Sequence, residues 1–190
     1  MLPVPALALG ADMEYTERMM HIVLVEPEIP QNTGNIARTC AATGASLHLV
    51  RPLGFSLDDR YLRRAGLDYW PMARVCVHED FPSLRAQYPD APLFFFTTKG
   101  ARRLDAFSYP DGALLVFGRE TRGLPEALLE KYPGRCVRIP MREGARSLNL
   151  AKSVAVALYE ALRQQGYPDL VGEGHATGRQ EEGVAWVDYL

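Results

Sequence analysis

The feature that most constrains the fold is a set of short apolar runs, each separated from the next by a helical pattern. The runs are continuous rather than alternating in hydrophobicity, as expected for strands buried on both faces. They cover residues 21–26, 46–50, 74–78, 93–98, 113–118 and 136–140. Helical patterns cover 33–43, 59–65, 81–87, 124–131 and 149–164. The alternation predicts an α/β domain with a mainly parallel sheet and helices on both faces.

The length of 190 residues predicts one domain with a real core, because a chain of this size buries roughly 70% of its unfolded surface. We assign this domain to residues 20–167. Residues 1–19 are expected to form a flexible N-terminal extension, since Met19 and Met20 directly precede the first strand and could be the true start. Residues 168–190 have the composition of a C-terminal tail.

The cysteines and histidines predict no metal site and no disulfide. Cys40, Cys76 and Cys136 are far apart and form no CxxC pair, so we interpret all three as small core residues in a reducing compartment. The four histidines lie in no ligand spacing and are expected to be structural or exposed. No apolar run reaches membrane length, and the first residues lack the basic flank of a signal peptide, so we expect a cytoplasmic protein.

The charge is unevenly distributed along the chain. The net charge is −2, but residues 1–18 carry −2 and residues 165–190 carry −4, which leaves +4 for the middle of the chain. A basic middle could attract a polyanion such as RNA. Exposed arginines in local ion pairs would give the same count, so charge alone leaves both interpretations open.

The usual signatures of nucleotide and hydrolase sites are missing. A parallel α/β sheet binds ligands at the carboxyl ends of its strands. After the first strand, however, the chain reads PEIPQNTGN, which is neither GxGxxG nor a P-loop. It also contains no GxSxG and no HExxH. A nicotinamide dehydrogenase is therefore disfavoured.

Three polar segments stand where strands give way to helices or loops. In the first, Asn32 or Thr33 can cap a helix that Gly44 terminates. Arg38 lies on this otherwise small and apolar helix, so we expect it to have a partner, usually a phosphate or a carboxylate.

The second polar segment, VFGRETRGLPEAL, ends a strand at Gly118, places Glu120 in a loop and starts a helix near Pro125. Its glycines permit either close approach by a ligand or two tight turns. The third segment, Arg146 to Asn149, opens a last helix that is apolar nearly all round. Such a helix is buried on more than one side, in a core or at a subunit interface.

Five motifs, in order, resemble the SPOUT-class RNA methyltransferases. They are EPEIPQNTGNIARTCAATG, RRAGLDYW, FTTKG, FGRETRGLP and IPMREGARSLNLAKSVAVALYEALRQ, within residues 21–167. The chain is most similar to the branch that methylates the ribose 2′-hydroxyl of the wobble nucleotide, cytidine or uridine 34, in certain leucine tRNAs. This resemblance implies an α/β sheet with a deep C-terminal trefoil knot, an exception to unknotted topology. It also implies a homodimer that binds S-adenosylmethionine in the knot.

The resemblance also implies roles for individual residues. Those expected to take part in catalysis are Asn32, Arg38, Glu120, Ser147 and Asn149. Those expected to line the methyl-donor pocket, an apolar slot with backbone donors and acceptors, are Phe96, Thr97, Gly118, Ile139, Pro140, Met141, Ser147 and Leu148. Those expected to contact RNA are Arg142, Arg146 and Tyr159. Since arginine stays protonated, we expect Arg38 to bind a phosphate and stabilise the developing alkoxide rather than act as a base.

Other functions remain open at this point. An enzyme of the same class could act on ribosomal RNA or on another tRNA position. A knotted protein could bind RNA without transferring a methyl group, although the full set from Asn32 to Asn149 speaks against this. A general nucleotide-binding regulator is a third alternative, and the missing glycine fingerprint is the evidence against it.

Overall fold

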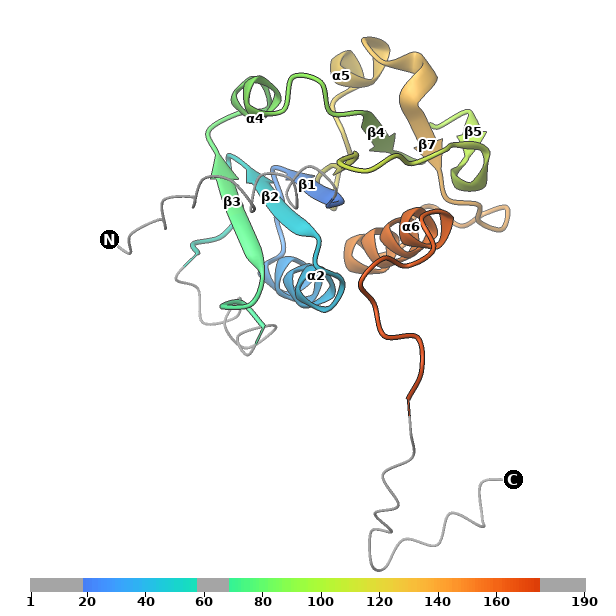
Figure 1. Cartoon of the computed structure of the whole chain (residues 1–190). Helices are drawn as coiled ribbons and strands as arrows, with labels where there is room; N and C mark the ends of the chain where they lie inside the picture. Colours follow the sequence, from blue (N-terminus) through green and yellow to red (C-terminus); the bar gives the residue numbers. More distant parts are fainter. Residues whose placement is uncertain (1–18, 58–68, 175–190) are drawn as a thin grey trace, which may run out of the picture.

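The computed structural model describes residues 19–57 and 69–174. Its centre is a seven-stranded sheet with the order β3-β2-β1-β6-β4-β7-β5 (Figure 1). The strands are β1 (His21–Val25), β2 (Ser46–Val50), β3 (Arg74–His78), β4 (Leu93–Phe96), β5 (Arg102–Arg103), β6 (Leu114–Phe117) and β7 (Cys136–Arg138). All neighbouring strands pair in parallel, which confirms the predicted sheet.

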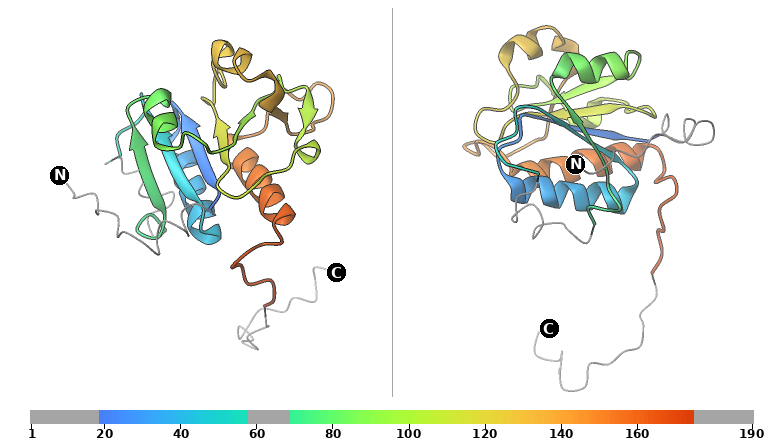
Figure 2. Two further views of the ribbon diagram at one scale, coloured as in Figure 1. Left: turned by 45° about the horizontal axis from the view of Figure 1, so that its top comes forward. Right: turned by 90° about the vertical axis from the view of Figure 1, so that its left-hand side faces the viewer.

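Helices cover both faces of the sheet, as predicted. Helices α2 (Pro30–Thr43) and α6 (Leu150–Gln164) lie side by side on one face, whereas α4 (Phe81–Gln87) and α5 (Glu126–Glu130) lie on the other (Figure 2). Two 3-10 turns, η1 (Leu104–Ala106) and η2 (Pro133–Arg135), complete the described elements. The predicted helix at 59–65 lies outside the described residues. Within the described parts, every helix is too short or too polar to cross a membrane.

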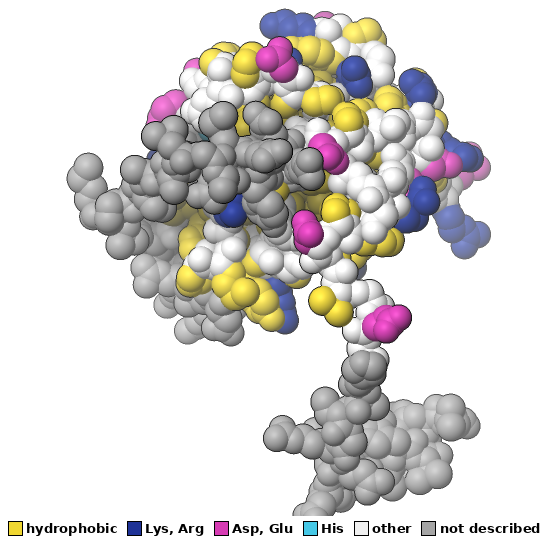
Figure 3. Space-filling model, viewed as in Figure 1, with side chains coloured by type: hydrophobic (Ala, Val, Ile, Leu, Met, Phe, Trp, Pro, Cys, Tyr) yellow, Lys and Arg dark blue, Asp and Glu magenta, His cyan; other side chains and the backbone are white. Residues whose placement is uncertain are grey.

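Positive charge is concentrated in the half of the chain that contains β4 to β7. Residues 93–146 carry ten Lys and Arg against six Asp and Glu, a net charge of +4. In Figure 3, several of these basic side chains lie around α5, β7 and β5, at the upper and right-hand parts of the molecule. The positive middle of the chain is thus largely one side of the fold.

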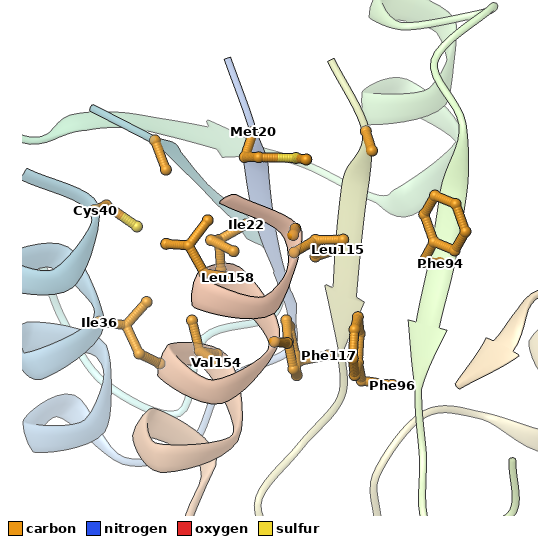
Figure 4. Packing of buried hydrophobic residues seen from close by; sticks show 14 of the residues in the cluster. Met20, Ile22, Ile36, Cys40, Phe94, Phe96, Leu115, Phe117, Val154 and Leu158 are labelled. Atoms are coloured by element: carbon orange, nitrogen blue, oxygen red, sulfur yellow. The ribbon is translucent and has the colours of Figure 1, made fainter. Parts of the chain in front are cut away.

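The larger core lies between the sheet and the helix pair α2 and α6. Val154 and Leu158 of α6 point toward Ile36 of α2 and toward Ile22 of β1 (Figure 4). All four side chains are fully buried. Burial of an aliphatic side chain of this size contributes about 1.5–3 kcal/mol, so this layer fixes α6 against the sheet. The start of α6 is thereby held at one end of the strands.

Helix ends follow the sequence signals only in part. Gly44 adopts φ 76° after α2, as expected for a left-handed C-terminal residue. The Asn149 side chain caps α6 by accepting a hydrogen bond from Lys152 N. The expectation that Asn32 or Thr33 caps α2 is wrong, because the helix begins three residues earlier, at Pro30. Asn32 lies inside the first turn, where its side chain is available for other bonds.

The edge of the sheet departs from the predicted burial. β3 is an edge strand, and its Cys76 and Val77 side chains are exposed rather than in the core. The expectation of a core cysteine is confirmed for Cys40, where burial raises the thiol pKa to about 12, whereas Cys136 is only half-buried. β5 was not predicted, since two exposed arginines carry no apolar signal.

Three histidines form a buried chain across β1, β2 and β3. His21 Nδ1 lies 2.9 Å from His48 Nε2, and His48 Nδ1 lies 3.0 Å from His78 Nε2. The ring of Tyr88 packs against His21 and His48. Burial holds the pKa of His48 well below its ordinary value, and the two neighbouring imidazoles lower it further. These three histidines are structural, as expected.

Candidate active site

The candidate site lies where the strand order changes direction. From β1 the chain proceeds outward to β2 and β3, and then returns to build β4, β6 and β7 on the other side of β1. Strands β1 and β6 are in parallel register, with Leu24 opposite Phe117, so their carboxyl ends open at the same edge. Ligands bind at such a reversal in open α/β sheets.

A cavity of about 750 Å³ opens at this edge. Its walls come from the segments that follow β1, β4, β6 and β7 and from the start of α6. The lining residues are Ile29, Asn32, Phe96, Thr97, Thr98, Lys99, Phe117, Gly118, Arg119, Glu120, Thr121, Arg122, Gly123, Leu124, Ile139, Met141, Arg146, Ser147, Leu148, Asn149, Leu150 and Ser153. The three polar segments found in the sequence therefore meet around one space.

Two of these segments are joined by reciprocal hydrogen bonds. The Glu120 carboxylate accepts from Glu28 N at 2.8 Å and from Ile29 N at 3.3 Å. In return, the Glu28 carboxylate accepts from Thr121 N at 3.0 Å and from the Thr121 hydroxyl at 2.8 Å. Because donors and acceptors on both sides are used, the loops after β1 and β6 hold each other in place.

Asn32 extends this bonding to the last helix. Its Nδ2 donates to Glu120 Oε1 at 3.1 Å, and its Oδ1 accepts from Asn149 Nδ2 at 2.9 Å. Glu120, Asn32 and Asn149 therefore form a row of side chains from three segments, which we call the cavity row. Asn149 caps α6 with its oxygen and joins the cavity row with its nitrogen, so one residue performs both tasks.

Gly118 is required by its own loop. A Cβ at this position would lie 2.2 Å from Gly123 C and from Leu124 N. Gly123 has φ +70°, and its N–H donates to Arg119 O at 2.9 Å, so the loop folds back tightly onto the end of β6. Of the two interpretations left open by the sequence, the tight turn is the one that this contact supports.

The cations around the cavity differ in their partners. Lys99 pairs with Glu126, and Arg119 pairs with Glu26. Within the described part of the chain, Arg122 and Arg146 make no ion pair and both are exposed. The mouth of the cavity therefore keeps uncompensated positive charge, which suits an anionic substrate.

Most of the residues expected at the site line the cavity, but four do not. Pro140 and Arg142 are exposed beside it, and Tyr159 lies on the outer side of α6 with 46% of its surface exposed. Arg38 lies on α2, where its guanidinium stacks 4.5 Å from the centre of the Tyr69 ring. A phosphate or a carboxylate was expected as the partner of Arg38, and the partner found within the chain is an aromatic ring.

Sequence reasoning missed Glu28 and Thr121, which bind the two loops together. A signal for Glu28 was available, because a carboxylate three residues after the end of a buried strand lies near the ligand-binding edge of the sheet. Thr121 carried no comparable signal, since a threonine in a glycine-containing loop is ordinary.

Comparison with known proteins fits this geometry. The model of the SpoU rRNA Methylase family matches residues 19–159. The chain belongs to this family. Two SpoU-type relatives are named tRNA (cytidine(34)-2′-O)-methyltransferase: the protein of Escherichia coli strain K12 is 52% identical over 155 residues, covering 80% of this chain and 98% of its own. That of Burkholderia pseudomallei is 53% identical over 152 residues, covering 78% and 97%.

Solved structures extend the match to three dimensions. A structure concerned with 2-OH methylation of C/U34 on tRNA has a TM-score of 0.75 and 49% identity, covering 79% of this chain and 98% of its own. The SpoU methyltransferase AviRb from Streptomyces viridochromogenes, in complex with AdoMet, has a TM-score of 0.68 and 25% identity, covering 78% and 61%. The resemblance inferred from the five motifs and the α/β fold is therefore confirmed.

The cavity of this SpoU methylase suits S-adenosylmethionine. Its volume is in the range of pockets for molecules of that size. The Phe96 and Phe117 rings stack 4.8 Å apart at one wall, while Thr97 and Gly118 add polar backbone at the strand ends. A group of three His, Cys, Asp or Glu side chains able to hold a metal is absent from the described residues. The aromatic rings and backbone groups of this wall thus fit an adenosyl group.

Proposed function

We propose that this protein methylates the ribose 2′-hydroxyl of nucleotide 34, cytidine or uridine, in tRNA, with leucine tRNAs as the substrates. The observation that carries the proposal is the cavity row, in which Asn32, Glu120 and Asn149 meet at one cavity. Relatives that this chain matches over nearly their whole length, named for methylation at position 34, support the choice of nucleotide.

S-adenosylmethionine supplies a methyl group activated by its sulfonium charge. We propose that the apolar part of the cavity holds the adenosyl group, through Phe96, Ile139, Met141 and Leu148, which line it. Thr97, Gly118, Pro140 and Ser147 would contribute backbone or hydroxyl groups. The cavity row keeps these walls at a fixed separation, which orients the reacting groups.

Arg38 is the residue that we assign to the ribose and its phosphate. A ribose hydroxyl is weakly acidic, so the negative charge that develops on its oxygen needs stabilisation. A guanidinium stays protonated and can bind a phosphate in a bidentate manner while it faces that oxygen. Proton removal then falls to the bound phosphate or to water.

We propose that the protein works as a homodimer through α6. Val156 and Leu148 each leave more than 40% of their surface exposed at or near this helix, although the helix is apolar nearly all round. Because α2 lies beside α6, a second copy on this face would bring its own Arg38 toward the cavity. Analytical ultracentrifugation tests this, since a monomer at micromolar concentration would contradict it.

We assign RNA contacts to Arg142, Arg146 and Tyr159. All three are exposed, and the two arginines belong to the half of the chain with a net charge of +4. Filter binding at graded salt concentrations tests the arginines, because loss of one phosphate contact lowers the salt slope by about 1.

The finer structural expectations also stay proposals. We propose that the segment from β7 to α6 forms the trefoil knot of the family, and that the protein acts in the cytoplasm, where its tRNA substrate is found. The boundaries at residues 20 and 167 stay predictions, although Met19 and Met20 are buried against the sheet.

The decisive experiment is methyl transfer from labelled S-adenosylmethionine to bulk tRNA from cells that lack this protein. Nuclease digestion then identifies the labelled nucleotide. We expect label on the ribose of nucleotide 34, and we expect Arg38→Ala to lose at least about a hundredfold in rate while it still binds the methyl donor. Label on a base, or no label on any RNA, would contradict the proposal.

A second candidate is methylation of ribosomal RNA, because the matching family model is described as an rRNA methylase. The same assay with ribosomal RNA from those cells separates the two substrates. Label that appears only on ribosomal RNA would keep the chemistry and the cavity assignments, but it would replace the substrate.

A further inference from the structure

One motif has no place in the cavity. The stretch RRAGLDYW is among the five motifs of the sequence, yet its described residues, Tyr69 and Trp70, do not line the cavity. They lie just before β3, on the side of the sheet that carries α2. What Tyr69 contacts there is Arg38.

The contact orients the guanidinium without using most of its donors. Arg38 Cζ lies 4.5 Å from the centre of the Tyr69 ring, and Arg38 Nη2 donates to the Tyr69 hydroxyl at 3.4 Å. A guanidinium carries five N–H groups in one plane. A ring below that plane and one long hydrogen bond leave the remaining donors free for a ligand.

The backbone of Tyr69 is held in place by hydrogen bonds. Its carbonyl oxygen accepts from Met72 N at 3.0 Å and from Ala73 N at 2.9 Å, which closes a turn directly before β3. The next residue, Trp70, packs against the large core. The ring is therefore anchored to the sheet, and α2 fixes the other end of the contact, as a preorganised site requires.

The chemistry of the partner matters as much as its position. A carboxylate beside Arg38 would neutralise it and compete with a phosphate. The ring of Tyr69 attracts the cation yet leaves its full charge, and within the described part of the chain Arg38 makes no ion pair. The arginine is thus held in one orientation and kept available to an anion.

We infer that Tyr69 is a positioning residue: its ring holds the guanidinium of Arg38 in the orientation in which Arg38 binds the phosphate and the developing alkoxide of the target ribose. This inference rests on the proposed function of Arg38. It gives the RRAGLDYW motif a task in the reaction that is independent of the methyl-donor cavity.

The test compares Tyr69→Leu with Tyr69→Phe in steady-state methylation of tRNA. Tyr69→Leu removes the ring and should lower kcat about tenfold to a hundredfold, with little change in the dissociation constant for S-adenosylmethionine. Tyr69→Phe keeps the ring and should stay within about threefold of the parent protein. Tyr167→Leu, an exposed tyrosine outside the site, is the matched control and should match the parent protein.

A double-mutant cycle separates positioning from stability. The variant with both Arg38→Ala and Tyr69→Leu should be no slower than Arg38→Ala alone, because the ring acts through the arginine. Additive losses, or a Tyr69→Phe as slow as Tyr69→Leu, would overturn the inference. If Tyr69→Leu does not fold, as judged by thermal unfolding, Tyr69→Gln takes its place in the cycle. An Arg38→Ala protein with full activity would instead refute the proposed role of Arg38 itself.

Discussion

Two rows of hydrogen-bonded side chains connect three elements each, and they serve different ends. The cavity row joins the loop after β6, helix α2 and helix α6, and it faces an open space. The histidine chain joins β1, β2 and β3 and is sealed beneath α4 and Tyr88. Rows of the same kind therefore fix the walls of a cavity in one place and bind strands together in the other. Substitutions in the cavity row should therefore lower activity, and substitutions in the histidine chain should lower stability.

Of the changes that compare the two rows, Glu120→Gln should have the largest effect, and that effect should be on activity. The Glu120 carboxylate accepts hydrogen bonds from Glu28 N, Ile29 N and Asn32 Nδ2. In the glutamine variant an NH2 group replaces one of the two accepting oxygens, so it would face at least one N–H donor without being able to accept from it. We expect kcat to fall about a hundredfold, because the loop that carries Gly118 shifts relative to Asn32. Single-turnover methylation of tRNA measures the effect. A rate within threefold of the parent protein would show that the cavity row does not control the reacting geometry.

The next effect is that of His48→Ala on stability. The imidazole is fully buried and bonds to His21 and His78, so its removal leaves a void and takes one hydrogen bond from each of these two residues. We expect a loss of about 2–4 kcal/mol in the free energy of unfolding, measured by urea denaturation. As a control, Val77→Ala at an exposed position of the neighbouring edge strand β3 should cost less than about 1 kcal/mol. The folded fraction of His48→Ala should keep its methylation activity. A loss of that activity would show that the histidine chain does not act on stability alone.

The smallest effect is the response to mild acid. The pKa of His48 and of His78 is lowered in the fold by burial, whereas an unfolded histidine titrates near 6.5. Below that pH the unfolded chain binds more protons than the folded one, so the free energy of unfolding should fall as the pH is lowered from 7 to 5. Thermal unfolding across this range measures the slope. His48→Ala should flatten it, and a slope unchanged in that variant would assign the effect to other groups.

The sequence predicted features that are local or that follow a strand directly. The parallel sheet, Gly44 as a helix end and the start of the last helix near Asn149 all follow from neighbouring residues. Glu120 was predicted by resemblance and by its place after a buried strand. The three polar segments could be expected to meet, since parallel strands end at one edge.

What the sequence could not predict depends on the approach of distant segments. Tyr69 meets Arg38 across 31 positions, and Thr121 meets Glu28 across 93. Nothing in the local pattern of either pair indicates its partner. The exposure of Cys76 could not be predicted for the same reason, because the apolar pattern of β3 does not reveal that β3 lies at the edge of the sheet.

The hydrogen bond between Asn32 and Asn149 spans 117 positions of sequence, and this has a consequence for how the protein is made. Closing so long a loop costs conformational entropy before the bond can form, so contacts of this kind arise late in folding. On the ribosome, β1, α2 and β2 emerge long before residue 149 leaves the exit tunnel. The amide of Asn32 therefore meets Asn149 only after nearly the whole domain has been synthesised, so the cavity row is completed late in the life of the nascent chain.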